Sequence, residues 1–322
     1  YGYNNTKVYY DLSDTLPEKL NCSQANKMLA ENFDGTNSIY MILADSNLSA
    51  EDSNAMMNEV NDLDGISFAL SIDSALGGEI PTEMLPDSLV SELKGDEYQI
   101  MMVSTNYTIA SDEINDQINK VDAIAKKYDA KSMVIGEAPL MKDLEDVTNV
   151  DLVNVNALSI AAIFIIIMII FKSISLPIIL VAVIEFAIMV NMAIPFYQGT
   201  SLPFVASIVI GAIQLGATVD YAILMTTRYQ KERQRGRDKM EAISIAHKTS
   251  MPSIISSGLS FFAATFGVAC YSQVEMIGSI CTLLARGAII SMVVVILILP
   301  AMFMIFDKVI CKTSIGFLGG KK

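Results

Sequence analysis

The hydrophobic pattern of the chain changes near residue 150. Before that point, short apolar runs alternate with amphipathic stretches and polar turns. After it come five long apolar runs, at residues 154–172, 176–196, 202–227, 251–271 and 284–306. A helix of about 20 apolar residues crosses the roughly 30 Å hydrocarbon layer of a membrane. The pattern therefore predicts a domain outside the lipid at residues 1–150, five transmembrane helices within residues 151–310, and a cytoplasmic tail at residues 311–322.

The first domain is predicted to have a mixed α+β fold. Strands are expected where short apolar or alternating runs end in turn residues, at residues 38–44, 66–72, 98–105 and 131–136. Helices are expected at residues 23–33, 49–63 and 111–128, and residues 76–96 form a longer loop with one short helix. Two successive β-α-β units predict a ferredoxin-like split β-α-β sandwich. The domain has no histidine and no metal-ligand pattern, so its acids are interpreted as a solvated surface.

Charge separates the two regions as well. Residues 1–153 contain 28 acids and 9 bases, net −19, whereas the remainder contains 7 acids and 13 bases, net +6, which together give −13. This asymmetry indicates two environments, and a strongly acidic domain makes nucleic acid an unexpected partner. The chain begins at Tyr1 with no visible signal peptide, so we expect a segment to precede it.

Basic residues predict the orientation in the membrane. Residues 228–239, between the third and fourth apolar runs, contain six bases and two acids, and four further lysines follow the fifth run. By the positive-inside rule both segments are expected in the cytoplasm. An odd number of helices then puts residues 1–150 outside the cytoplasm. Residues 242–246, beside the single histidine His247, are interpreted as an amphipathic helix on the inner leaflet.

The third apolar run contains an acidic residue, Asp220, eight positions before Arg228. If Arg228 reaches the headgroups, Asp220 lies about 12 Å inside the membrane. A carboxylate at that depth costs at least about 2.5 kcal/mol, so it is expected to face protein or water and to bind and release protons. Tyr221 would donate a hydrogen bond to it, while Gly216 and Ala217 predict close packing of another helix. The alternatives are a carboxylate bonded between helices and an aromatic ring that fills a gap.

Each of the other polar side chains in the apolar runs has two interpretations. Glu185, in the second run, belongs either to an ion route or to a structural contact with a neighbouring helix. Arg286 either extends to the outer headgroups or pairs with an acid in the bundle. Four serines recur at helical spacing and form either a water-holding stripe or a packing seam whose hydroxyls bond back to the helix; the seam is favoured. They are Ser253, Ser256, Ser257 and Ser260.

These residues resemble a known family. Gly216-Ala-Thr-Val-Asp220-Tyr221, followed by Arg228-Tyr229, resembles the Gly-x-x-x-Asp-Tyr signature of the MMPL transporters in the resistance-nodulation-division (RND) superfamily. Ser173-Ile-Ser-Leu-Pro177 and Leu284-Ala-Arg286-Gly287 resemble that family too. The resemblance implies one six-helix half of an RND-type transporter without its first helix, and a porter-like outer domain. The short tail favours the carboxyl-terminal half, although an internal cut would look similar.

The resemblance also implies a function. It is export of hydrophobic or amphiphilic substrates, such as lipids, lipopeptides or drugs, across the cytoplasmic membrane, driven by the proton motive force. Expected partners are membrane lipids, the other half upstream, the substrate and further copies of the chain, with no cofactor or metal. The alternative is a membrane sensor, or an assembly or protein-export accessory protein, of the same architecture. An intramembrane aspartyl protease needs two facing aspartates, and only Asp220 lies deep in an apolar run.

Overall fold

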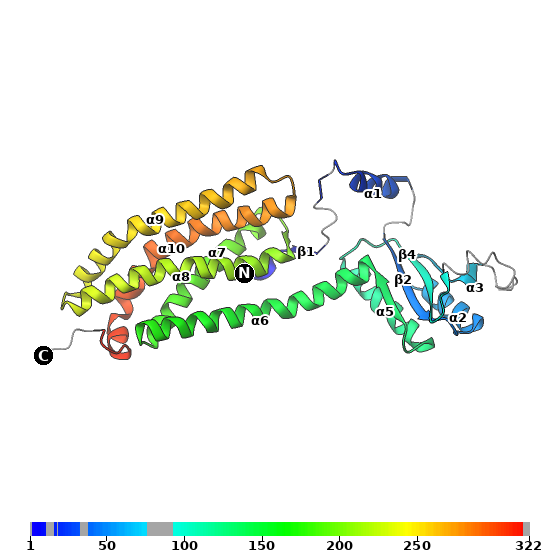
Figure 1. The fold of residues 1–322 in the computed structure, drawn as a ribbon, viewed down its shortest axis with the longest axis horizontal. Coiled ribbons are helices and arrows are strands. Elements are labelled where there is room, and N and C mark those ends of the chain that lie inside the picture. The colour runs from blue at the N-terminus through cyan, green and yellow to red at the C-terminus, as the bar shows by residue number, and fades with distance from the viewer. Residues whose placement is uncertain (1, 11–15, 18, 33–37, 76–92, 318–322) are drawn as a thin grey trace. The chain divides into compact units, whose positions relative to one another are not determined.

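A computed structural model describes residues 2–10, 16–17, 19–32, 38–75 and 93–317. The chain divides into two units, one of Leu16–Val147 and one that joins Tyr1–Thr15 to Thr148–Lys322. The first unit is an α/β domain and the second is a helical bundle (Figure 1).

Four strands form the sheet of the α/β domain. They are β2 (Ser38–Asp45), β3 (Ile66–Leu70), β4 (Tyr98–Thr105) and β5 (Met133–Gly136). Their order is β3-β4-β2-β5 with every neighbouring pair antiparallel. Helix α2 (Ala50–Asn61) connects β2 to β3, and α5 (Asp112–Tyr128) connects β4 to β5. This is the split β-α-β order that the sequence predicted. Two further helices are α1 (Asn21–Asn32) and α3 (Ile72–Ala75). Most of the predicted loop, residues 76–92, lies outside the described residues.

The sequence explains why these elements form. Along β2 the burial alternates, so that Tyr40 and Ile42 point into the core, as a period of two requires. The buried stripe of α5 includes Ile114 and Val121. Ser111 caps that helix by accepting a hydrogen bond from the Ile114 backbone N–H. The sheet, α2 and α5 therefore share one apolar core.

A surface contact joins α2 to α5. The Lys127 ammonium and the Tyr128 hydroxyl both donate to the same carboxylate oxygen of Glu59. These hydrogen bonds, that of Lys127 first, hold the pKa of Glu59 below its ordinary value of 4.5. A carboxyl whose pKa falls on folding stabilises the folded state above its unfolded pKa, and that contribution is lost as the pH falls through the folded pKa.

We therefore expect Glu59→Gln to weaken the contact of α2 with α5 at neutral pH and to make it less sensitive to acid below pH 4.5. Amide hydrogen exchange of α2 and α5 in the full-length protein, followed across pH, measures both effects. Asp116→Asn, an exposed acid on α5, is the matched control and should leave the pH profile unchanged. Identical profiles for Glu59→Gln and wild type would contradict this expectation.

Five helices among the described residues are long and apolar enough to cross a membrane, which confirms the predicted number. They are α6 (Glu137–Phe171), α7 (Ser175–Gln198), α8 (Phe204–Gln234), α9 (Lys239–Tyr271) and α10 (Glu275–Thr313). Helices α7 to α10 run side by side around one apolar core (Figure 1). Helix α6 is less covered: Leu158 is 73% exposed and Ile169 67% exposed, as suits a helix that faces lipid.

The predicted amphipathic surface helix at residues 242–246 is wrong as a separate element. Helix α9 runs without interruption from Lys239 to Tyr271. Ala242, Ile243 and Ala246 are buried in the core cluster of the bundle. The apolar side of this segment therefore packs on protein rather than lying on a lipid surface.

The first residues of the chain pack with the bundle. They therefore do not belong to the α/β domain, which was predicted to cover residues 1–150. The Thr6 hydroxyl donates to the Met192 carbonyl at 3.0 Å. Strand β1 (Val8–Tyr9) pairs in parallel with β6 (Leu202–Pro203). This segment has no long apolar run, so hydropathy alone gave no reason to separate it from the domain that follows.

Candidate functional site

Asp220 lies on an open face of α8. It is exposed, as are Ala212, Ile213 and Gly216, which the helical period puts on the same side. Among the residues that the structure describes, none donates a hydrogen bond or forms an ion pair to the Asp220 carboxylate. A Cβ added to Gly216 would meet no atom within 4 Å. The close helix that Gly216 and Ala217 predict is therefore absent from the described part of this chain.

Tyr221 faces the core of the bundle instead. Its side chain is 5% exposed and packs in the core of the bundle. Consecutive residues of a helix point about 100° apart, so a buried Tyr221 and an exposed Asp220 cannot share one face. The predicted hydrogen bond from Tyr221 to Asp220 is not formed.

The serine stripe of α9 is also exposed. Ser253, Ser256, Ser257 and Ser260 all face outward. The Ser260 hydroxyl donates to the Ser256 carbonyl at 2.8 Å, a bond back to its own helix. This hydroxyl bonds back to its own helix, while all four side chains are exposed, so the packing seam stays a prediction.

Arg286 pairs with an amide rather than with a carboxylate. Its Nε donates to Asn191 Oδ1 at 2.8 Å, and one terminal nitrogen donates to the Asn191 carbonyl at 2.9 Å. A second terminal nitrogen reaches Gln198 Oε1 at 3.4 Å. These bonds fix α10 against α7 and satisfy a charged side chain that a membrane helix could not otherwise hold at low cost.

A buried polar network continues from Asn191 into α8. Asn191 Nδ2 donates to Gln214 Oε1 at 2.9 Å, and Gln214 Nε2 donates to Ser291 Oγ at 3.0 Å. The Thr218 hydroxyl donates to the same Ser291 oxygen at 2.8 Å. Sequence reasoning missed this network. The sequence did contain a signal for it, because an asparagine and a glutamine inside apolar runs need hydrogen-bond partners.

Gly287 leaves the space that this network occupies. A Cβ at this position would lie 2.7 Å from Asn191 Nδ2 and 2.8 Å from Gln214 Oε1. We expect Gly287→Ala to displace both amides and to destabilise the bundle by about 1–3 kcal/mol. Thermal unfolding of the full-length protein in detergent measures the loss. Gly267→Ala, where a Cβ meets nothing within 4 Å, is the control, and equal melting of the two variants would contradict the expectation.

A second polar cluster joins the ends of α8 and α10. The Tyr229 hydroxyl donates to Asp307 Oδ1 at 2.6 Å, and Arg233 donates to Asp307 Oδ2 at 3.0 Å. Asp307 is 7% exposed. The Tyr229 ring stacks on Phe303 with centroids 5.0 Å apart and an interplanar angle of 5°. Asp307 is thus a structural acid that holds two helices together.

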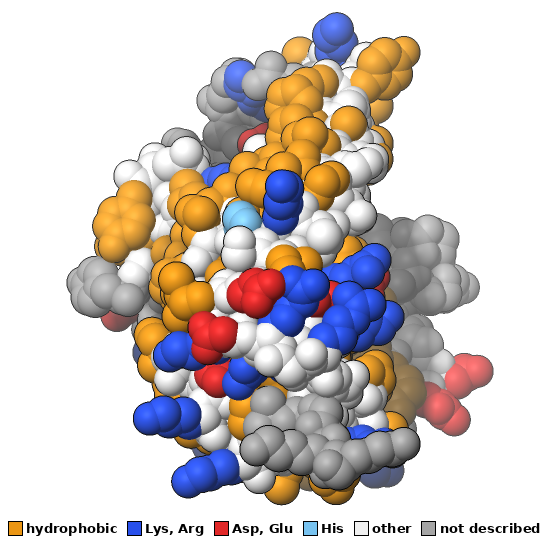
Figure 2. All heavy atoms as spheres, turned by 90° about the vertical axis from the view of Figure 1, so that its left-hand side faces the viewer, with side chains coloured by type: hydrophobic (Ala, Val, Ile, Leu, Met, Phe, Trp, Pro, Cys, Tyr) orange, Lys and Arg blue, Asp and Glu red, His pale blue; other side chains and the backbone are white. Residues whose placement is uncertain are grey.

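Basic side chains gather where α8 meets α9 and α10 ends. Figure 2 shows this end of the bundle, with lysines and arginines around a smaller number of acids. Exposed members include Arg228, Lys231, Arg235, Lys308 and Lys312. We call this the basic end.

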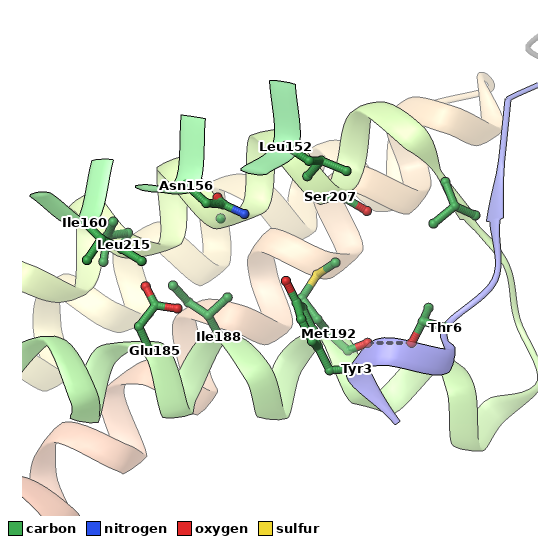
Figure 3. A pocket seen from close by; sticks show the side chains of 12 residues that line it. Tyr3, Thr6, Leu152, Asn156, Ile160, Glu185, Ile188, Met192, Ser207 and Leu215 are labelled. Carbon is green, nitrogen blue, oxygen red and sulfur yellow. Dashed lines mark hydrogen bonds between the residues drawn. The ribbon is translucent and has the colours of Figure 1, made fainter. Parts of the chain in front are cut away.

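Glu185 lies halfway along α7 and points into a cavity of about 380 Å³ (Figure 3). Helices α6, α7 and α8 and the first residues of the chain form its walls. Glu185 lies toward one end of the cavity, beside Ile160 and Leu215, whereas Thr6 and Ser207 line the other (Figure 3). Within residues 2–317, apart from the undescribed gaps, no group of three His, Cys, Asp or Glu side chains could hold a metal ion.

Sequence comparisons agree with the resemblance. The MMPL family profile matches residues 15–312. The chain is similar to the membrane protein YdgH of Bacillus subtilis, with 24% identity over 78% of this chain and 28% of the relative. It is also similar to the mycolic acid-containing lipids exporter MmpL11 of Mycolicibacterium smegmatis, with 23% identity over 57% of this chain and 19% of that protein. A third relative is the siderophore exporter MmpL5 of Mycobacterium tuberculosis, with 21% identity over 62% of this chain and 21% of that protein. The chain spans less than a third of the length of each of these relatives.

Proposed function

Because the chain belongs to the MMPL family of membrane transporters, we propose that it is part of an exporter driven by the proton motive force. Its substrates would be hydrophobic or amphiphilic molecules moved across the cytoplasmic membrane. Two relatives that are named exporters, of lipids for MmpL11 and of siderophores for MmpL5, support this class of activity. Such substrates partition into lipid, from which a membrane protein can collect them.

Asp220 is the observation that carries the proposal. It is an acid without a described partner, on the open face of an apolar helix. An ionised carboxylate facing acyl chains is costly, so this face is expected to meet protein or water in the complete transporter. Protonation would remove the charge and change how that face packs. Proton uptake and release at Asp220 would thereby be coupled to helix movement.

The second, similar half of the transporter is the proposed partner of this face. Exposed small residues, Ala212 and Gly216, would let a helix approach closely. Transporters built from repeats bind their coupling ions at the interface between the repeats. Tyr221, buried within the bundle, would then support the position of α8 and would join a proton relay only after α8 rotates.

The basic end is assigned to the cytoplasm. Its lysines and arginines (Figure 2) satisfy the positive-inside rule. Three of the five apolar helices, α6, α7 and α8, lie between the α/β domain and this end in the chain, so the domain would stand outside the cytoplasm. There it would act as a porter domain that guides the substrate.

Reconstituted vesicles containing the full-length protein provide the test. Proton uptake and export of a labelled amphiphile are measured in the same vesicles, with an imposed pH gradient. Export that continues unchanged after the gradient is collapsed would refute proton coupling. A non-transporting sensor would show neither flux.

A further inference from the structure

We propose that the cavity containing Glu185 is a binding site for amphiphiles with a positively charged amine head. The ammonium group would lie against the Glu185 carboxylate, and the apolar body would lie along the rest of the cavity. If such a molecule is also a transported substrate, that part of the inference rests on the proposed function. Binding itself requires no proton gradient.

The Glu185 carboxylate has no partner in the described part of the chain. Among the described residues, none forms an ion pair or a hydrogen bond with Glu185. The described residues that line the cavity include no lysine, arginine or histidine. An ionised carboxylate in such surroundings is expensive unless a cation accompanies it. A ligand that brings its own positive charge would offset this cost, whereas a carboxylate or phosphate head would be repelled.

The remaining walls suit an apolar chain. Ile160, Ile188, Met192, Leu152 and Leu215 contribute apolar side chains to the lining. The volume of about 380 Å³ falls in the usual range of roughly 300–1,000 Å³ for small-molecule sites. A site that served protons alone would not need this space. The combination of one carboxylate with a long apolar wall therefore indicates a lipophilic cation.

Polar groups at other points in the cavity can orient the ligand. Asn156 projects from α6 between Glu185 and Ser207 (Figure 3). It lies close to α8, because a Cβ on Gly211 would be 2.8 Å from Asn156 Oδ1. Asn156 therefore brings a polar amide against α8 in the middle of the cavity, within reach of a ligand whose head lies at Glu185.

Three probes with the same chain and different heads test the proposal. Dodecylamine, dodecanol and dodecanoic acid, each with a photoreactive diazirine in the chain, are added to the full-length protein in nanodiscs without a gradient. We expect dodecylamine, which is protonated at neutral pH like a lysine side chain, to label α6, α7 and α8 at the lowest concentration. Glu185→Gln should weaken its binding about tenfold or more, as loss of a charge-assisted contact implies, while dodecanol labelling stays unchanged.

Two further variants test whether a loss of binding comes from the cavity itself or from the proposed proton coupling. Ser207→Phe fills the cavity without changing charge and should reduce labelling by dodecylamine and dodecanol alike. Unchanged dodecanol labelling in Glu185→Gln shows that this variant is folded. Asp220→Asn should lose proton flux and keep dodecylamine binding, so the site and the proposed function can fail independently. Equal labelling by all three probes, or undiminished dodecylamine binding in Glu185→Gln, would overturn the proposal.

Discussion

Asp220→Asn is expected to reduce both proton uptake and amphiphile export to the leak rate of protein-free vesicles. The asparagine has nearly the same shape but cannot take up a proton at neutral pH. Because Asp220 is exposed and lacks a described partner within the chain, its replacement should not unfold the bundle. Measurement of proton flux and of export in the same preparation, together with the melting temperature, separates loss of coupling from loss of structure.

The matched control for this experiment is Asp151→Asn, an exposed acid on α6. It makes the same chemical change at a position with no proposed role in coupling, and both fluxes should persist. Asp220→Glu keeps a titratable carboxylate one methylene further out and should retain part of the flux. If Asp220→Asn transports at the wild-type rate, the proton-driven mechanism proposed for this chain is wrong.

Asp307→Ala is expected to give the largest loss of stability. Removal of this carboxylate leaves the Arg233 guanidinium, whose side chain is 14% exposed, without its counter-charge and leaves the Tyr229 hydroxyl without its acceptor. Breaking a buried ion pair by removing one partner costs about 3–5 kcal/mol, and we expect the lower end because Arg233 retains some access to water. Thermal unfolding of the full-length protein in detergent measures the change.

Lys308→Ala alters the exposed neighbour of Asp307 and should melt within a degree or two of wild type. Replacing the whole group with apolar residues, Tyr229→Phe with Arg233→Met and Asp307→Leu, removes every unpaired polar atom at once and should recover most of the loss. A melting temperature of Asp307→Ala equal to that of Lys308→Ala would show that the cluster does not hold α8 to α10.

Hydrophobic periodicity and charge predicted much of the architecture. The five apolar runs became five helices because a continuous apolar segment has few other ways to satisfy its backbone in lipid. The alternation of β2 and the stripe of α5 predicted a sheet covered by helices, since a period of two or of 3.6 puts all apolar side chains on one side. The mistaken surface helix at residues 242–246 shows the limit of this reasoning. An apolar stripe indicates that something covers it, but not whether lipid or protein does.

By itself, the sequence determined the number of apolar helices, the split β-α-β order, the family resemblance and the position of Asp220 within its helix. These follow from local periodicity and from residues close together in the chain. Only the tertiary structure decided that Tyr221 faces away from Asp220, that Arg286 binds Asn191, that Asp307 is locked to Tyr229 and Arg233, and that Glu185 faces a cavity. Each of these depends on how helices rotate and pack against one another. That rotation is fixed by contacts between residues far apart in the chain, such as Arg286 and Asn191, which are 95 positions apart, and no local pattern encodes such contacts.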